Sequence, residues 1–155
     1  MARIRVYADT SVFGGVADEE FAEPSRRFLE RVRRGEVILV VSTEVLRELR
    51  GAPQIVRQEL EGLPQENLEA AEVTAEVEAL ADAYIAAGVL GGGWRGDAIH
   101  VAAASVSGAD LIVSWNFRHI VNYNRIPRYN AVNASNGYKP IEIRSPAEVA
   151  YDDET

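Results

Sequence analysis

The sequence predicts a single α/β domain in which a central parallel β-sheet is flanked by helices on both faces. Short apolar runs of strand length alternate along the chain with segments whose apolar residues recur at helical spacing. One of these runs, EVILVVS at 36–42, is apolar almost throughout, which is typical of a parallel strand buried on both faces. Such alternation builds βα units, which assemble into parallel sheets. The length of 155 residues and the hydrophobic content of 47% suit one core, and we expect the domain to cover 1–150 and an acidic tail to cover 151–155.

Two strands and three helices are expected in the first half of the chain. The β-branched run IRVYA predicts a strand at 4–8, and the apolar run at 36–42 predicts the second strand. Apolar residues at helical spacing predict a helix at 24–35 between these strands. The same spacing predicts two further helices, at 42–51 and at 53–63.

Capping residues mark the ends of two of these helices. Gly35 stands directly after the apolar residues of the first helix and is expected to end it. Ser42 or Thr43 can cap the helix at 42–51, because a short hydroxyl side chain accepts a hydrogen bond from the first turn. This helix is expected to bury one face, made by Val45, Leu46 and Leu49.

The second half of the chain repeats the alternation. Helical spacing predicts a helix within 73–90, which ends before the glycines at 91–93, and a helix rich in small residues follows at 97–108. The run ADLIVSW predicts a third strand at 109–115. An edge strand is expected at 139–145, before one turn of helix in the motif SPAEV.

Composition and charge exclude several classes of protein. The chain has no cysteine, which excludes disulfides, thiolate zinc sites and cysteine nucleophiles and favours a cytoplasmic protein. No apolar stretch approaches the roughly 18 residues of a transmembrane helix, and the amino terminus does not resemble a signal peptide. The net charge of −8 argues against a broad nucleic-acid-binding surface, although a local basic cleft is compatible with it.

Three acidic residues stand where an α/β fold gathers ligands. Asp9 closes the first predicted strand, Glu48 follows the second, and Asp97 opens the helix at 97–108. Because ligand sites of open α/β sheets lie at the carboxyl ends of the strands, we expect these side chains to converge. Carboxylates brought close together raise one another's pKa unless a cation neutralises them, which predicts a hard cation such as Mg²⁺ or Mn²⁺. The alternative is that the two aspartates are helix caps and that Glu48 lies on a solvated helix face.

The arginines fall into groups with different expected roles. Those between Arg26 and Arg34 are expected to pair with glutamates on helix faces. No acidic residue occurs between Asn116 and Lys139, where bases alternate with aromatic residues: Arg118, His119, Tyr123, Arg125, Arg128, Tyr129 and Tyr138. Such a stretch could hold single-stranded nucleic acid by phosphate pairing and base stacking.

Four motifs occur in order along the chain: YADTSVF, VSTEVLREL, GDAIHVAAA and DLIVSWNF. With these motifs the chain resembles the PIN-domain nucleases, in particular the VapC-like toxins of type II toxin–antitoxin systems. The resemblance spans nearly the whole chain. It implies a PIN-like α/β fold, a ribonuclease that binds Mg²⁺ or Mn²⁺ and hydrolyses RNA with a metal-activated water, and a homodimer silenced by a cognate antitoxin.

The resemblance assigns roles to individual residues. Asp9, Glu48 and Asp97 match the three acids of the family pattern, and Thr10 and Ser11 match the hydroxyl pair after the first acid. These hydroxyls are expected to orient a water or contact the phosphate. The family commonly has an aspartate after the last central strand, whereas this chain reads Ser114, Trp115 and Asn116. An amide oxygen can bind a metal or its water but brings no negative charge, so one metal or two remain open.

Four further residues are candidates for supporting roles. Glu44 lies one helical turn before Glu48 and could approach the same ion, although its place in a first turn also suits the helix dipole. His100, one turn after Asp97, is expected either to reach the cleft or to be a hydrogen-bonded core residue. Arg118 and His119 are expected to contact RNA or to form a surface pair.

Two other functions fit the same residues. The change at Asn116 is compatible with a catalytically impaired PIN-like module that binds RNA or protein. A phosphatase could use Asp9 as a covalent nucleophile. It would lack the second aspartate two residues on, where Ser11 stands, and would have Lys139 as the only lysine.

Overall fold

The protein is built on a five-stranded parallel sheet with the strand order β3-β2-β1-β4-β5. The structure is a computed structural model that describes residues 2–151. The strands are β1 (Ile4–Ala8), β2 (Val37–Ser42), β3 (Leu68–Ala71), β4 (Leu111–Val113) and β5 (Glu142–Arg144). The predicted α/β architecture with a central parallel sheet is confirmed. The acidic tail predicted at 151–155 lies, from residue 152 onward, outside the described residues.

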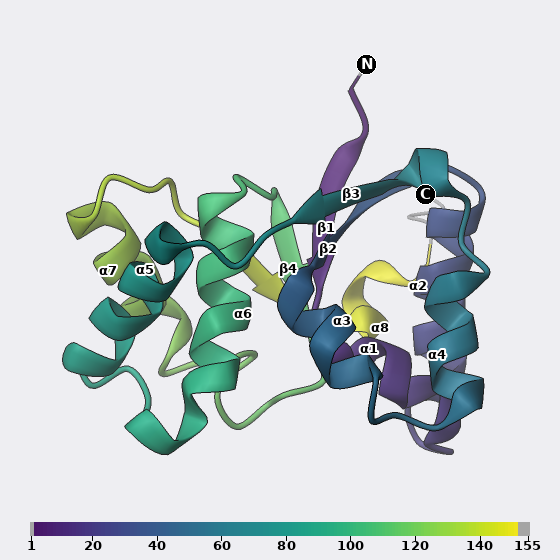
Figure 1. The fold of residues 1–155 in the computed structure, drawn as a ribbon, viewed down its shortest axis with the longest axis horizontal. Coiled ribbons are helices and arrows are strands. Elements are labelled where there is room, and N and C mark those ends of the chain that lie inside the picture. Colours follow the sequence, from purple (N-terminus) through teal and green to yellow (C-terminus); the bar gives the residue numbers. More distant parts are fainter. Residues whose placement is uncertain (1, 152–155) are drawn as a thin grey trace.

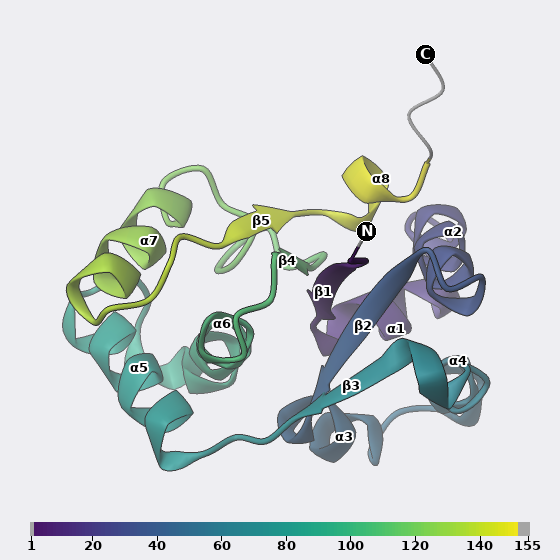
Figure 2. The same cartoon turned by 90° about the horizontal axis from the view of Figure 1, so that it is seen from above.

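Helices cover both faces of the sheet, as predicted (Figures 1 and 2). On one side lie α1 (Thr10–Gly14), α2 (Ala22–Arg33), α4 (Gln54–Glu61) and α8 (Pro146–Val149). On the other side lie α5 (Ala75–Ala86), α6 (Arg95–Val106) and α7 (Ile126–Ser135). The helix α3 (Thr43–Leu49) continues directly from the end of β2. Among residues 2–151, no helix is long and apolar enough to cross a membrane.

The predicted elements of the first half are present, with one error in the buried face of α3. Ser42 caps this helix, since its Oγ accepts a hydrogen bond of 3.2 Å from the N–H of Val45. Val45 and Leu49 are buried, as expected from their separation of one helical turn. Leu46 was expected on the same face but is 46% exposed, because the next residue along a helix is rotated by about 100°.

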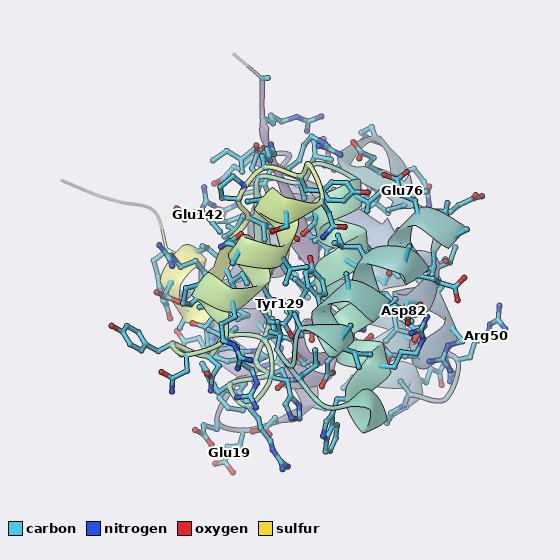
Figure 3. The ribbon with its side chains drawn as sticks, turned by 90° about the vertical axis from the view of Figure 1, so that its left-hand side faces the viewer. Glu19, Arg50, Glu76, Asp82, Tyr129 and Glu142 are labelled. Atoms are coloured by element: carbon cyan, nitrogen blue, oxygen red, sulfur yellow. The ribbon has the colours of Figure 1, made fainter. Side chains whose placement is uncertain are left out.

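The elements α1, β3 and α7 were not predicted. The sequence of β3 is LEAA, which has no β-branched residue. The helix α7 lies inside the acid-free stretch, and it buries Tyr129 against Tyr84 with ring centroids 4.9 Å apart. Figure 3 shows Tyr129 between α7 and the neighbouring helices. The hypothesis that this whole stretch holds nucleic acid is therefore wrong for Tyr129, which belongs to the core.

Part of the first group of arginines forms ion pairs with glutamates of α2, as predicted, whereas Arg26 donates a hydrogen bond of 3.0 Å to the Val16 carbonyl. In α2, Arg27 pairs with Glu23 at 3.2 Å and Arg33 pairs with Glu30 at 2.7 Å. These side chains are largely exposed, so solvent screens the charges and each pair contributes little to stability. Their arginines are already neutralised by carboxylates of the same helix.

A buried polar network joins the three helices α5, α6 and α7. The side-chain oxygen of Asn133 accepts a hydrogen bond from the Tyr84 hydroxyl, and its Nδ2 donates to Ser105 Oγ at 3.0 Å. All three side chains are buried. A buried polar group that loses its partner costs more free energy than the hydrogen bond itself supplies, so this network selects one packing of the three helices.

We expect Asn133→Ala to lower the free energy of unfolding by about 1–3 kcal/mol, because it leaves the Tyr84 and Ser105 hydroxyls without this partner. Urea denaturation followed by circular dichroism measures the change. Asn124→Ala is the matched control, since Asn124 is exposed. Equal stability of the two variants would show that the network does not hold the helices together.

Candidate active site

Four residues singled out in the sequence lie at the edge of the sheet where β1, β2 and β4 end: Asp9, Glu48, Ser114 and Asp97. Asp9 and Ser114 directly follow β1 and β4, and Glu48 lies in α3, the helix that follows β2. Asp97 lies in the first turn of α6, which begins two residues earlier than predicted. Parallel strands place all these ends on one side.

Asp9 is the most buried of the three acids, with 3% of its surface exposed. Its two carboxylate oxygens accept hydrogen bonds from Ser11 Oγ at 2.6 Å and from Ser114 Oγ at 2.8 Å. Burial raises the pKa of Asp9, and the negative charge of Asp97 raises it further, while His100 and the two hydroxyls oppose the rise.

Glu48 connects the starts of α1 and α6. Its Oε1 accepts a hydrogen bond from Thr10 Oγ1 and lies 2.7 Å from His100 Nε2. A Cβ placed on Gly96 would lie 3.8 Å from Glu48 Oε2, so this carboxylate reaches the residue before Asp97. Burial opposes ionisation of Glu48, but the hydrogen bond and charge of His100 outweigh it and lower the pKa.

His100 is a buried, hydrogen-bonded residue of the core that also contacts the site. It is 2% exposed, and its Nδ1 lies 2.7 Å from the Tyr7 hydroxyl, which lies 2.7 Å from Ser42 Oγ. Burial lowers the pKa of His100, but Glu48 and Asp9 outweigh that effect and raise it. The expectation of a packed, hydrogen-bonded core histidine is thus confirmed, and the second nitrogen of the ring faces Glu48.

His119 holds Asp97 in the same way. Its Nδ1 lies 2.9 Å from Asp97 Oδ2, and the residue is 4% exposed. The hydroxyl of Tyr129 donates a hydrogen bond of 2.7 Å to the His119 carbonyl and fixes the backbone there. The expectation of a surface pair with Arg118 is wrong for His119, because this imidazole turns inward to the carboxylate, whereas Arg118 is exposed.

Asn116 shapes the turn after β4. Its Oδ1 accepts a hydrogen bond of 2.9 Å from the N–H of His119, and its own N–H donates to Ser114 Oγ at 2.9 Å. The preceding residue, Trp115, is half-buried, stacks on Phe21 and donates from Nε1 to Ser25 Oγ. Asn116 therefore positions the histidine that holds Asp97.

Glu44 is committed to a different partner. It lies in the first turn of α3 and forms an ion pair with Arg47 at 2.5 Å. This contact favours the assignment of Glu48, rather than Glu44, as the second acid of the site.

Oxygen donors dominate the site, which suits a hard cation such as Mg²⁺ or Mn²⁺. The donors are the carboxylates of Asp9, Glu48 and Asp97, with the amide of Asn116 beside them. Within residues 2–151, no group of three His, Asp or Glu side chains is arranged so that it could hold a metal ion. Each carboxylate is instead bound by a hydroxyl or an imidazole, so a cation would have to displace or share these contacts.

Tyr7 and Trp94 belong to this region and were not predicted. Tyr7 lies in β1, and its hydroxyl lies 2.7 Å from His100 Nδ1. Trp94 precedes α6, and its ring centroid lies 4.4 Å from that of His119. The positions of both residues in the sequence could have indicated their place in the site. Tyr7 lies two residues before Asp9, and residues two apart in a strand point to the same face. Trp94 lies three residues before Asp97, which is about one helical turn.

We expect Tyr7→Phe to lower the free energy of unfolding by about 1–3 kcal/mol, because it removes the partner of two buried groups, His100 Nδ1 and Ser42 Oγ. Chemical denaturation measures this loss. Tyr123→Phe is the control, since Tyr123 is 92% exposed. No difference between the variants would mean that the Tyr7 hydroxyl does not support His100.

Comparison with known proteins identifies the fold. No protein-family model and no curated relative matches the sequence. The structure is similar to that of VapBC2 from Rickettsia felis bound to a DNA fragment from its promoter, with a TM-score of 0.60, 14% identity and coverage of 92% of this chain and 98% of that one. It is also similar to VapC20 of Mycobacterium tuberculosis, a toxin that cleaves the sarcin–ricin loop, with a TM-score of 0.56, 16% identity and coverage of 74% and 92%. The chain therefore has the fold of these VapBC2 and VapC20 structures, and the predicted PIN-like α/β domain is confirmed.

Proposed function

We propose that the protein is a Mg²⁺- or Mn²⁺-dependent endoribonuclease that hydrolyses phosphodiester bonds and acts as the toxin of a toxin–antitoxin pair. The observation that carries this proposal is the placement of Asp9, Glu48 and Asp97 at the carboxyl ends of the strands, in a fold shared with an RNA-cleaving toxin. A buried carboxylate beside two others is costly without positive charge nearby.

The three acids are the proposed metal ligands. After exchange of their present hydroxyl and imidazole contacts, Asp9 and Asp97 would hold the cation with Glu48. A bound Mg²⁺ or Mn²⁺ would supply Lewis acidity at the scissile phosphate and an activated water. The raised pKa of Asp9 supports this assignment, since burial and the charge of Asp97 both favour an added cation.

The neighbouring residues orient these ligands. Ser11 and Ser114 hold the two oxygens of Asp9, and Thr10 and His100 hold one oxygen of Glu48. Such outer contacts fix the directions of ligand lone pairs. Because Thr10 and Ser11 donate to carboxylates, we assign them to positioning rather than to nucleophilic attack.

The partners follow from the same proposal. The similarity to VapBC2 supports a cognate antitoxin, and we propose that this antitoxin binds a homodimer of the chain in the cytoplasm. A guanidinium from the antitoxin would match the charge of the three carboxylates.

Asp97→Asn removes one negative charge while keeping the size of the side chain. We expect it to abolish Mn²⁺ binding in calorimetry and to lower the rate of cleavage of a mixed RNA pool by about 100-fold or more. Asp82→Asn is the control, because Asp82 is exposed and pairs with Arg95 outside the acidic site. Cleavage that survives both Asp97→Asn and EDTA would refute the metal-dependent mechanism.

Asn116→Asp restores the acid that the family commonly has. The new carboxylate keeps the acceptor for the N–H of His119, so we expect tighter Mn²⁺ binding and faster RNA cleavage, by about tenfold. Asn122→Asp is a matched control, since Asn122 Oδ1 likewise accepts from backbone N–H groups two and three residues on. An equal gain in both variants would trace the effect to net charge.

The hydrogen bonds on all three carboxylates also fit a second function, a catalytically impaired module that binds RNA or protein. The same experiment separates the two. If the wild type neither binds Mn²⁺ nor cleaves RNA while Asn116→Asp gains both, the protein is the impaired module.

A further inference from the structure

Trp94 is an exposed aromatic residue beside the acidic site. It ends the turn η3 (Gly92–Trp94) and precedes α6, and 45% of its surface is exposed. Its ring lies against His119, with centroids 4.4 Å apart and an angle of 36° between the planes. A large aromatic ring left this exposed beside a group of carboxylates is a candidate contact for a ligand.

The position of Trp94 is fixed relative to the carboxylates. His119, on which it packs, lies 2.9 Å from Asp97, and the backbone of His119 is held by Asn116 and Tyr129. Trp94 therefore contacts His119, and His119 contacts Asp97. A group stacked on Trp94 would lie next to the proposed reaction site.

Arg118 adds a positive charge to the same surface. Its guanidinium carbon lies 5.1 Å from the Trp94 ring centroid, and no carboxylate of residues 2–151 forms an ion pair with it. A similar pair elsewhere differs in this respect: Arg27 lies 4.9 Å from the ring of Tyr151 but is bound to Glu23. Turning Arg118 toward a phosphate would thus break no ion pair.

The approach to Trp94 is open because glycines precede it. Residues 91–93 are exposed and have no side chains, and a Cβ on Gly93 would meet no atom within 4 Å. The glycines therefore do not cover the indole, and a base that stacks on it would take the place of the Arg118 guanidinium that lies over the ring.

We propose that Trp94 and Arg118 form a subsite for one unpaired nucleotide of the RNA substrate, in which the base stacks on the indole and Arg118 binds the adjacent phosphate. The subsite rests on the proposed function, because it defines where that substrate lies. The three carboxylates repel a phosphodiester. The guanidinium of Arg118 and the indole of Trp94, next to these carboxylates, supply the attraction that the carboxylates lack. Any base can stack on an aromatic ring, so the subsite requires that the nucleotide be unpaired but does not select a particular base.

The test measures RNA binding without cleavage. A fluorescein-labelled single-stranded RNA of mixed sequence is titrated with the protein in EDTA at low ionic strength, and anisotropy reports binding. We expect Trp94→Ala to weaken binding roughly tenfold, Trp94→Phe to retain most of the affinity, and Arg118→Ala to weaken binding and reduce its salt dependence. Tyr151→Ala, the matched exposed aromatic, leaves binding unchanged.

An oligonucleotide of the same length with abasic sites separates stacking from charge. It retains the phosphates but offers no base, so wild type and Trp94→Ala should bind it equally. Weaker binding of this probe by Trp94→Ala, or normal binding of the intact RNA by that variant, overturns the subsite, as does a wild type that binds no RNA.

Failure of the subsite and failure of the proposed function give different results. RNA cleavage by a wild type whose RNA binding does not depend on Trp94 overturns the subsite alone. Binding that depends on Trp94 in a protein that cleaves no RNA with Mg²⁺ or Mn²⁺ retains the subsite and overturns the nuclease.

Discussion

The burial of the Asp9 carboxylate is the constraint on which the rest of the site depends. A buried charge is tolerated only where hydrogen bonds and opposite charge compensate for lost water. Ser11 and Ser114 supply the hydrogen bonds, and each hydroxyl also accepts from a backbone N–H, of Trp115 and Asn116 respectively. The same two hydroxyls thereby fix the path of the chain after β4. The contacts of one buried carboxylate thus hold the ends of β1 and β4 together.

The two histidines of the chain both face carboxylates of the site. His100 contacts Glu48 from the core, and His119 contacts Asp97 from the turn after β4. Each acid is thus held in one direction before any ligand is present. This preorganisation reduces the rearrangement that binding requires, but it also places imidazole where a cation would compete for the same oxygens.

Most of the fold and the three acids could be predicted because both follow from local signals. The strands at 4–8 and 36–42 are dense in β-branched residues, Asp9 directly follows the first, and Glu48 lies in the helix that follows the second. By contrast, the residues of β3 have no strand preference of their own, since they are mostly alanine and include a glutamate that pairs with Arg5. The segment forms a strand because it pairs with β2. The helix α7 is rich in asparagine, and its burial depends on Tyr84 and Ser105, which lie far away in sequence.

The hydrogen bond between Asp9 and Ser114 joins residues 105 positions apart, and β1 completes its pairing only when β4 is present. Contacts of such long separation form slowly, because closing the long loop between the two residues costs conformational entropy before the contact is gained. A growing chain on the ribosome therefore carries Asp9, Glu48 and Asp97 before it carries the segment that holds them together. The carboxylates of Asp9 and Asp97 therefore reach their fixed positions only after residues 114–119 have been made, so a shorter nascent chain carries the acids without the contacts that hold them.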